Sequence, residues 1–291
     1  MDGETCSLSG CPAISAIYFA LLQNGYDFYA IERDPLTVNR LGSFISPDRR
    51  AYPFFSEVRQ NTCEAYPYWP RAALLETAAF YTDSARGCFA DFDAYQRRVL
   101  SAENISDAER NAAFWDWIPQ FPAALKEVLQ SGGFRRYLEW ETAWTAGQNR
   151  SCQADLNRIA DVFAFCKEKW NVPFQRFQIV LNPIKCVYSA DYHLQNETFI
   201  VCSGAFREEP VIHELLHHAV HPAAARRKDE VLRCSFGDLE LDASYYLDGG
   251  EAGKMNAFEE YLVRRLTDKV FSGDAPEHLD AFLDHEILHL Q

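Results

Sequence analysis

The chain has 291 residues, which fits one large domain or two smaller ones and is long enough to bury a substantial core. Its composition of 48% hydrophobic, 14% aromatic and 24% charged residues excludes a disordered, collagen-like or low-complexity protein. The formal net charge is -14, from 28 Lys and Arg against 42 Asp and Glu. Such a chain repels phosphate backbones, so nucleic acid is not expected as a partner.

The nine cysteines are scattered along the chain, and no pair has the two-residue spacing of a zinc knuckle or a redox motif. This usage is typical of reduced, mostly buried thiols and predicts a cytoplasmic protein. The uncharged stretch from Thr5 to Tyr26 has an apolar core only from Pro12 to Leu22, shorter than the roughly 20 residues of a membrane-spanning helix. No membrane association is expected.

Residues 1–172 are predicted to form a mostly α-helical region. Helical periodicity predicts helices over Ala13–Gln23, Arg71–Tyr81 and Cys152–Trp170, and the capping box Ser106–Glu109 predicts the start of another. No internal repeat or linker is evident. We expect this region to pack on, or to cover, a cleft formed by the rest of the chain.

Residues 173–291 are predicted to form a second region that contains the chemistry. The β-rich runs Phe177–Leu181 and Thr198–Cys202 predict two strands, with room for a third. From Glu208 onward the helical period returns, interrupted by turn sequences around Gly249 and Gly273. The predicted fold class is therefore α+β, with a small antiparallel or mixed sheet followed by helices.

The most informative motif is His213-Glu214-Leu215-Leu216-His217. Residues four apart lie on one face of a helix, so both imidazoles can reach one metal ion while Glu214 sits beside it. Pro210 suits a first helical turn and Pro222 is expected to end the helix after about eleven residues. Both histidines are therefore expected in the middle of a helix.

A second helix is predicted to follow over Asn256-Ala257-Phe258-Glu259-Glu260-Tyr261-Leu262-Val263-Arg264. With the His-Glu motif, this segment resembles the zincin metallopeptidases, and among them the gluzincin type, over about Phe177 to Val270. The resemblance implies a Zn²⁺ ion held by His213, His217 and a glutamate of the second helix. Glu260 is the preferred ligand, because the Leu and Arg that follow it match the family pattern.

The choice between the two adjacent glutamates stays open. At about 100° per residue, Glu259 shares the most apolar face of the second helix, whereas Glu260 lies at the border of that face. The helical wheel thus favours Glu259, and the family pattern favours Glu260. A solvated acidic pair with no ligand role is the third interpretation.

The spacing between the two helices differs from that of the thermolysin-like members of the family. It is longer, so an inserted loop, Ala223–Gly253, is expected to cross over the site. The metzincin subclass requires a histidine at position 223, where this chain has alanine. That subclass is therefore not favoured.

The chain has three further candidates for histidine ligands: His221, His218 and a second His-Glu pentad. His221, one turn after His217, could coordinate, but Pro222 follows it and the helix end can turn it away, so His221 is expected to be a helix-terminal histidine or one that supports a ligand. His218 is expected to pack or to meet solvent because it points about 100° from His217. The second His-Glu pentad, His285–His289, is expected to be an amphipathic docking helix, because no later residue can supply a third ligand.

The resemblance implies a zinc-dependent peptidase that acts on a peptide or protein substrate. Zinc lowers the pKa of a water to about 7, and Glu214 serves as the general base that takes its proton. Tyr245, Tyr246 or His221 are candidate donors to the oxyanion. Thr198–Cys202 is expected to be an edge strand that pairs with an extended peptide.

Two other interpretations stay open. The chain can be a catalytically silent zincin-like domain that keeps the metal for stability or for partner binding, or a helical scaffold in which both His-Glu pentads are accidental. Peptide cleavage that a chelator stops separates an enzyme from the silent domain. Zinc that is substoichiometric after purification favours the accidental scaffold.

Overall fold

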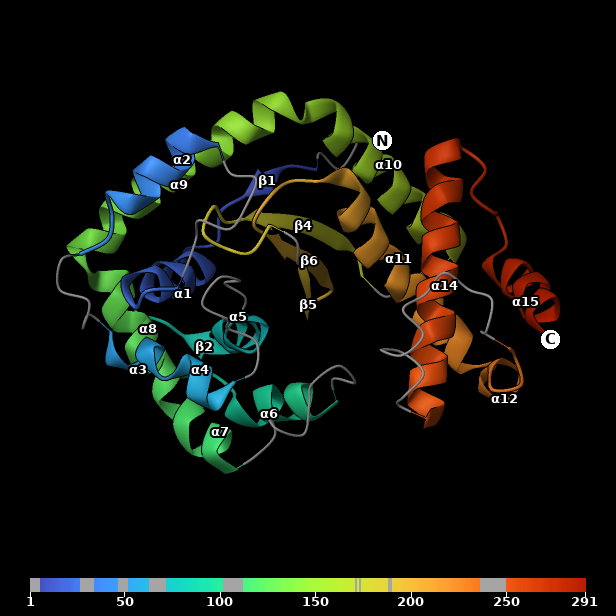
Figure 1. Ribbon diagram of the computed structural model, residues 1–291, viewed down its shortest axis with the longest axis horizontal. Helices are drawn as coiled ribbons and strands as arrows, with labels where there is room; N and C mark the ends of the chain where they lie inside the picture. The colour runs from blue at the N-terminus through green and yellow to red at the C-terminus, as the bar shows by residue number, and fades with distance from the viewer. Residues whose placement is uncertain are drawn as a thin grey trace.

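The computed structural model describes residues 6–26, 34–46, 52–62, 72–101, 112–170, 172, 174–187, 190–235 and 250–291. Figure 1 shows a small central sheet with helices around it. None of the helices in these ranges combines the length and the hydrophobicity that a membrane span requires. The cytoplasmic location stays a prediction.

Helices dominate the chain before the sheet. They are α1 (Pro12–Gln23), α2 (Pro35–Gly42), α3 (Pro53–Ser56), α4 (Val58–Asn61), α5 (Ala73–Phe80), α6 (Phe92–Ser101), α7 (Ala112–Trp117), the 3-10 helix η2 (Ile118–Gln120), α8 (Phe121–Gln130), α9 (Gly132–Ser151) and α10 (Gln153–Trp170). The three helices predicted from periodicity are confirmed as α1, α5 and α10. The capping box Ser106–Glu109 lies outside the described residues.

The central sheet has four strands in the order β1-β4-β6-β5. They are β1 (Leu8–Ser9), β4 (Arg176–Leu181), β6 (Thr198–Ser203) and β5 (Asp191–Gln195), and a separate hairpin joins β2 (Thr82–Asp83) to β3 (Cys88–Phe89). The pairs β1/β4 and β4/β6 are parallel, and β5/β6 is antiparallel. The expectation of helices with a small mixed sheet is confirmed. Strand β1 was not predicted, because two residues are too few to show a period.

The expectation that Thr198–Cys202 forms an edge strand is wrong. Strand β6 has a strand on each side, β4 and β5, and β5 is at the end of the strand order. The reason is the two-residue turn Asn196-Glu197, whose φ angles of 47° and 60° fold β5 back against β6. Turns with two positive φ angles match the right-handed twist of a hairpin.

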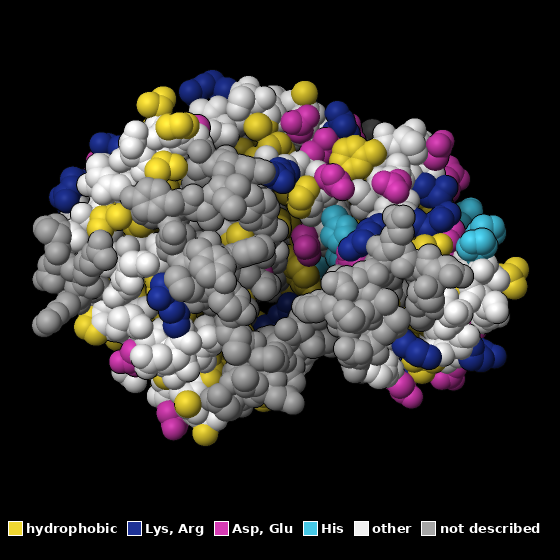
Figure 2. All heavy atoms as spheres, in the orientation of Figure 1, with side chains coloured by type: hydrophobic (Ala, Val, Ile, Leu, Met, Phe, Trp, Pro, Cys, Tyr) yellow, Lys and Arg dark blue, Asp and Glu magenta, His cyan; other side chains and the backbone are white. Residues whose placement is uncertain are grey.

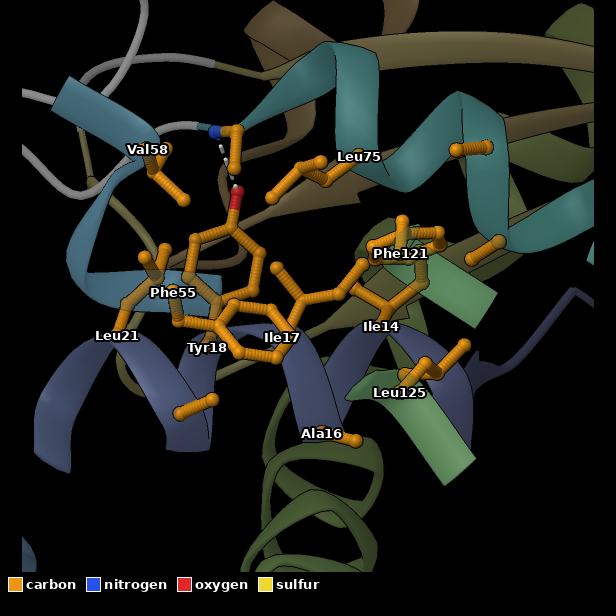
Figure 3. Packing of buried hydrophobic residues seen from close by; sticks show 14 of the residues in the cluster. Ile14, Ala16, Ile17, Tyr18, Leu21, Phe55, Val58, Leu75, Phe121 and Leu125 are labelled. Carbon is orange, nitrogen blue, oxygen red and sulfur yellow. Dashed lines mark hydrogen bonds between the residues drawn. The ribbon is translucent and has the colours of Figure 1, made fainter. Parts of the chain in front are cut away.

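The sheet lies between two helical layers, and its alternating side chains enter two different cores. Phe199 and Val201 point to the core that contains α10 and the helices after the sheet. Ile200 and Cys202 point to the core of α1, α5 and α8. Figure 3 shows that second core, with side chains of α1 packed against Phe55, Leu75 and Phe121. Each core contains residues from both sides of residue 172, and the predicted division there stays a prediction.

The helices after the sheet are longer than expected. They are α11 (Glu208–Ala225), α12 (Lys228–Val231), α14 (Gly250–Ser272) and α15 (Leu279–Leu290). The prediction that Pro222 ends the helix is wrong, since Pro222 lies inside α11. An internal proline costs about 3 kcal/mol. The burial of Ala223 and Ala224 in the last turn offsets part of that cost.

The predicted inserted loop is wrong at both of its ends. Ala223 belongs to α11 and Gly253 to α14, and α12 lies between them. Both ends are buried within their helices: Ala223 is 1% exposed, and Gly253 is among the buried residues of α14. Residues 236–249, where the expected crossing over the site falls, lie outside the described residues.

A buried lysine ties the N-terminal helices to the sheet. Lys185 follows β4 and is fully buried, with its Nζ 2.8 Å from Glu76 Oε1 of α5 and in contact with Asp191 of β5. Tyr18 of α1 also contacts the ammonium. Burial opposes the charge, but the two carboxylates outweigh it and hold the pKa of Lys185 above its ordinary value. The ion pairs therefore persist across neutral pH.

Lys185→Met is expected to lower the free energy of unfolding by about 3 to 5 kcal/mol, because it leaves two buried carboxylates without their cation. Urea unfolding followed by circular dichroism measures the change. Lys126→Met, a partly exposed lysine of α8 outside this ion-pair network, is the control and is expected to stay within about 1 kcal/mol of the parent. Equal stability of the Lys185→Met and Lys126→Met proteins would contradict the role of the buried ion pairs.

A second buried carboxyl lies on α9. Asn182 Nδ2 donates to Glu141 Oε1 at 2.7 Å, and Asn182 Oδ1 accepts from the backbone N–H groups of Ile184 and Lys185. Burial raises the pKa of Glu141 to about 7, although hydrogen bonds to it act in the other direction. Glu141 therefore begins to ionise within the folded protein near neutral pH.

A raised acid pKa stabilises the fold when the group is protonated. The contribution is complete below the ordinary pKa of 4.5 and is lost as the pH rises through about 7. The free energy of unfolding is expected to fall by about 2 to 4 kcal/mol from pH 4.5 to 8. Glu141→Gln should flatten this fall in urea titrations, and Glu139→Gln, on the exposed side of α9, should not. A parallel pH profile for Glu141→Gln and the parent would exclude Glu141 as the cause.

Candidate metal centre

Helix α11 carries the His-Glu motif against the core. Its first turn holds Glu208 and Glu209, whose charges suit the positive end of the helix dipole. One face is buried, and His213 and His217 lie beside that face, half-buried. The buried residues of the helix are Val211, Ile212, Leu215, Leu216, Ala219, Val220, Ala223 and Ala224. Packing of this face therefore fixes the direction of both imidazoles.

Helix α14 places Glu259 and Glu260 next to His213 and His217 of α11. Its apolar residues Phe258, Leu262 and Leu266 are fully buried and share a core with α11. Glu259 and Glu260, on the adjoining part of the helix surface, face the histidines of α11. Figure 2 shows histidine side chains at the surface with acidic and basic side chains around them.

The structure brings His213, His217 and Glu260 together. The two Nε2 atoms are 3.1 Å apart, and Glu260 Oε2 lies 3.5 Å from that of His213 and 3.4 Å from that of His217. In a tetrahedral zinc site with bonds of 2.0 to 2.1 Å, two ligand atoms are separated by about 3.3 Å. The three atoms thus fit the corners of such a site, and two imidazoles with one carboxylate are ligands that zinc accepts.

Glu259 has a different position from Glu260. Its Oε1 lies 2.9 Å from His217 Nδ1, and its Oε2 lies 2.9 Å from Nδ1 of His221. A carboxylate on Nδ1 fixes the ring and leaves Nε2 facing the triad, which is the usual support for a metal-binding histidine. Glu259 therefore fits the role of an orienting residue, a role that sequence reasoning weighed only as direct ligation.

Burial and neighbouring charged groups have opposite effects on the pKa values of His217 and Glu260. Burial lowers the pKa of His217, but hydrogen bonds to Glu259 and Glu260 outweigh this and raise the pKa to about 10. Burial likewise opposes ionisation of Glu260, but the two histidines hold the pKa of its carboxyl below the ordinary value. The acidic pair thus offers a positively charged group a strongly favourable position. A bound metal cation would replace the proton on His217.

Glu214 shares a cleft with two of the three candidate ligands, His213 and Glu260. The cleft has a volume of about 410 Å³ and is lined by Ala190, Glu209, Pro210, His213, Glu214, Glu260 and Arg264. Burial raises the pKa of the Glu214 carboxyl, although the two histidines act in the opposite direction. A carboxyl with this environment is suited to accept and release a proton.

The other histidines behave as expected in two cases and differently in one. His218 packs against Tyr192 and Phe199, and burial lowers its pKa to about 3. The pentad His285–His289 lies in α15, whose Leu283 and Ile287 are buried, so the docking-helix prediction is confirmed. His221 differs in its position, because α11 continues past Pro222 and His221 is not at the end of the helix. Its Nδ1 lies 2.9 Å from Glu259 Oε2, a contact that fits the supporting role expected for it.

The candidates for an oxyanion donor are only partly placed. Tyr245 and Tyr246 lie outside the described residues. The Nδ1 of His221 is held by Glu259, and its side chain is 50% exposed. The role of each stays a prediction.

The described residues contain one more group with ligand-type side chains, Glu76, His193 and Cys202, which the sequence did not indicate. These residues are far apart in the chain, and the packing of α5 against β5 and β6 brings them together. His193 Nε2 lies 2.7 Å from Glu76 Oε2, and Thr77 Oγ1 is 3.3 Å from Nδ1. Because Lys185 already neutralises Glu76, this group belongs to the buried ion-pair network.

No protein-family model, curated protein or solved structure matches this chain. The zincin interpretation therefore depends on the motif and on the geometry described above.

Glu260→Gln is expected to abolish stoichiometric zinc binding, because it removes a charged ligand atom. Glu259→Gln is expected to keep zinc and weaken its affinity about 10- to 100-fold, because it removes only the support of His217. Metal content after dialysis and competition with a chromophoric chelator measure both. Glu251→Gln, at the exposed start of α14, is the control. If zinc is lost only in the Glu259→Gln protein, the two roles are exchanged.

Proposed function

We propose that this protein is a zinc-dependent metallopeptidase of gluzincin type, with His213, His217 and Glu260 as the metal ligands. The observation that carries the proposal is the triangle of 3.1, 3.4 and 3.5 Å between one atom of each residue. It is supported by Glu214, which lies in the same cleft. The resemblance of the motif gives the class of enzyme, and the geometry is compatible with it.

His213, His217 and Glu260 would hold the zinc ion, which would supply Lewis-acid chemistry: it would polarise the substrate carbonyl group and lower the pKa of a water to about 7. Glu214 accepts the proton of the attacking water at its carboxylate and then donates that proton to the leaving amine. Glu259 holds the ring of His217 through Nδ1. Glu260 is held in turn by Arg264, whose Nε donates to Oε1 at 2.9 Å.

Strand β5 supports a peptide as the substrate. In a two-residue hairpin the residues next to the turn, Gln195 and Thr198, form a hydrogen-bonded pair, and such pairs alternate along the ladder. The backbone N–H and C=O of Leu194 are therefore directed away from β6. Ala190, immediately before β5, lines the cleft. An extended peptide laid along β5 would thus enter the cleft beside His213 and Glu214.

Glu214→Gln is expected to retain zinc and to reduce peptide hydrolysis by at least about 100-fold, because it removes the general base but no ligand. Digestion of a peptide library by the zinc-loaded protein, read by mass spectrometry, measures the effect. The control variant is Glu230→Gln, an exposed glutamate of α12.

A chelator must stop the parent activity and added zinc must restore it. Retained turnover in the Glu214→Gln protein would remove Glu214 from the mechanism. A parent protein that binds one zinc ion and cleaves nothing would instead favour the catalytically silent metal-binding domain.

A further inference from the structure

The cleft beside the candidate metal centre contains one cationic side chain among its described lining residues, Arg264. The other charged groups there, Glu209, Glu214 and Glu260, are acidic. A negatively charged part of a substrate therefore has one favourable side-chain position in the cleft besides the metal itself.

The guanidinium of Arg264 is held in place but only partly used. Its Nε donates to Glu260 Oε1 at 2.9 Å, one helical turn away on α14. The side chain is 50% exposed, and within the described ranges neither Nη atom has a hydrogen-bond partner. Because Nε alone anchors the group, the two Nη atoms keep their N–H donors for a ligand. Such a planar pair of donors matches the two oxygens of a carboxylate.

Glu260 also fixes the distance between the guanidinium and the metal position. Its Oε2 faces the two imidazoles, and its Oε1 faces Arg264. The carboxylate of Glu260 thus lies between the guanidinium and the metal position, with one oxygen facing each. In a peptide whose scissile carbonyl is at the metal, the next residue on the amine side begins about 1.3 Å from the carbonyl carbon and its own carboxyl carbon follows two bonds later. A carboxylate on that residue is therefore within reach of Nη.

We infer that Arg264 is a specificity-determining residue that binds a substrate carboxylate on the residue immediately after the scissile bond. The inference rests on the proposed zinc peptidase function. The carboxylate is either the C-terminus of the substrate or the side chain of an aspartate or glutamate at that position. Glu209 and Glu214 repel a carboxylate placed elsewhere in the cleft, which confines the preference to this position.

The test is binding of three thiol probes to the zinc-loaded full chain, measured by isothermal titration calorimetry. Mercaptoacetyl-alanine carries a terminal carboxylate, mercaptoacetyl-aspartate α-amide carries only a side-chain carboxylate, and mercaptoacetyl-alaninamide carries none. At least one acidic probe is expected to bind about 10- to 100-fold more tightly than the alaninamide, the usual range for hydrogen bonds to a charged group. The tighter of the two acidic probes identifies the source of the carboxylate.

Arg264→Met is expected to abolish this preference, and Arg264→Lys to keep part of it, because lysine retains the charge without the planar pair of donors. Arg233→Met, an exposed arginine after α12, is the matched control and should keep the full preference. The zinc affinity of each variant is measured separately.

Four results would overturn the inference. An acid preference that survives Arg264→Met excludes the guanidinium as its source. An equal loss of affinity for all three probes shows that Arg264 only supports Glu260. Equal binding of the acidic and amide probes by the parent removes the carboxylate preference while the metal site stands, whereas a chain that binds no zinc overturns both the inference and the proposed function.

Discussion

The packing of α11 against α14 is the constraint on which the candidate site depends. Both helices bury an apolar face in one core, with Leu215 and Leu216 on the first and Phe258 and Leu262 on the second. That contact fixes the separation of the polar residues at its border. The imidazole of His217 consequently lies between two carboxylates, Glu259 at Nδ1 and Glu260 near Nε2.

This arrangement explains why two adjacent glutamates can both serve one site. Neighbouring residues of a helix point about 100° apart, so they rarely act on one partner. An imidazole has two nitrogens on different sides of its ring, and each nitrogen here meets one carboxylate. The helical wheel and the family pattern are thus compatible with two roles, Glu259 as a support for the ring and Glu260 as the candidate ligand beside the cleft.

On the other side of the cleft, the position of strand β5 is fixed by contacts with the N-terminal helices. Ala190 lines it, and the next residue, Asp191, pairs with the buried ammonium of Lys185. The same ammonium contacts Glu76 of α5 and Tyr18 of α1. The helices of the first half therefore support the strand next to the candidate metal centre, although none of the described residues that line the cleft comes from them.

By itself the sequence determined the elements with a strong period and the candidate site within α11, because His213, Glu214 and His217 are close in the chain and share one helix. The position of Glu260 also followed from a local pattern. Tertiary structure alone decided what depends on distant contacts: the place of β5 at the sheet edge, the continuation of α11 through Pro222, and the partners of Glu259, Arg264 and Lys185. The physical reason is that local periodicity encodes which face of an element is apolar, whereas neighbours distant in sequence are set by the packing of whole elements.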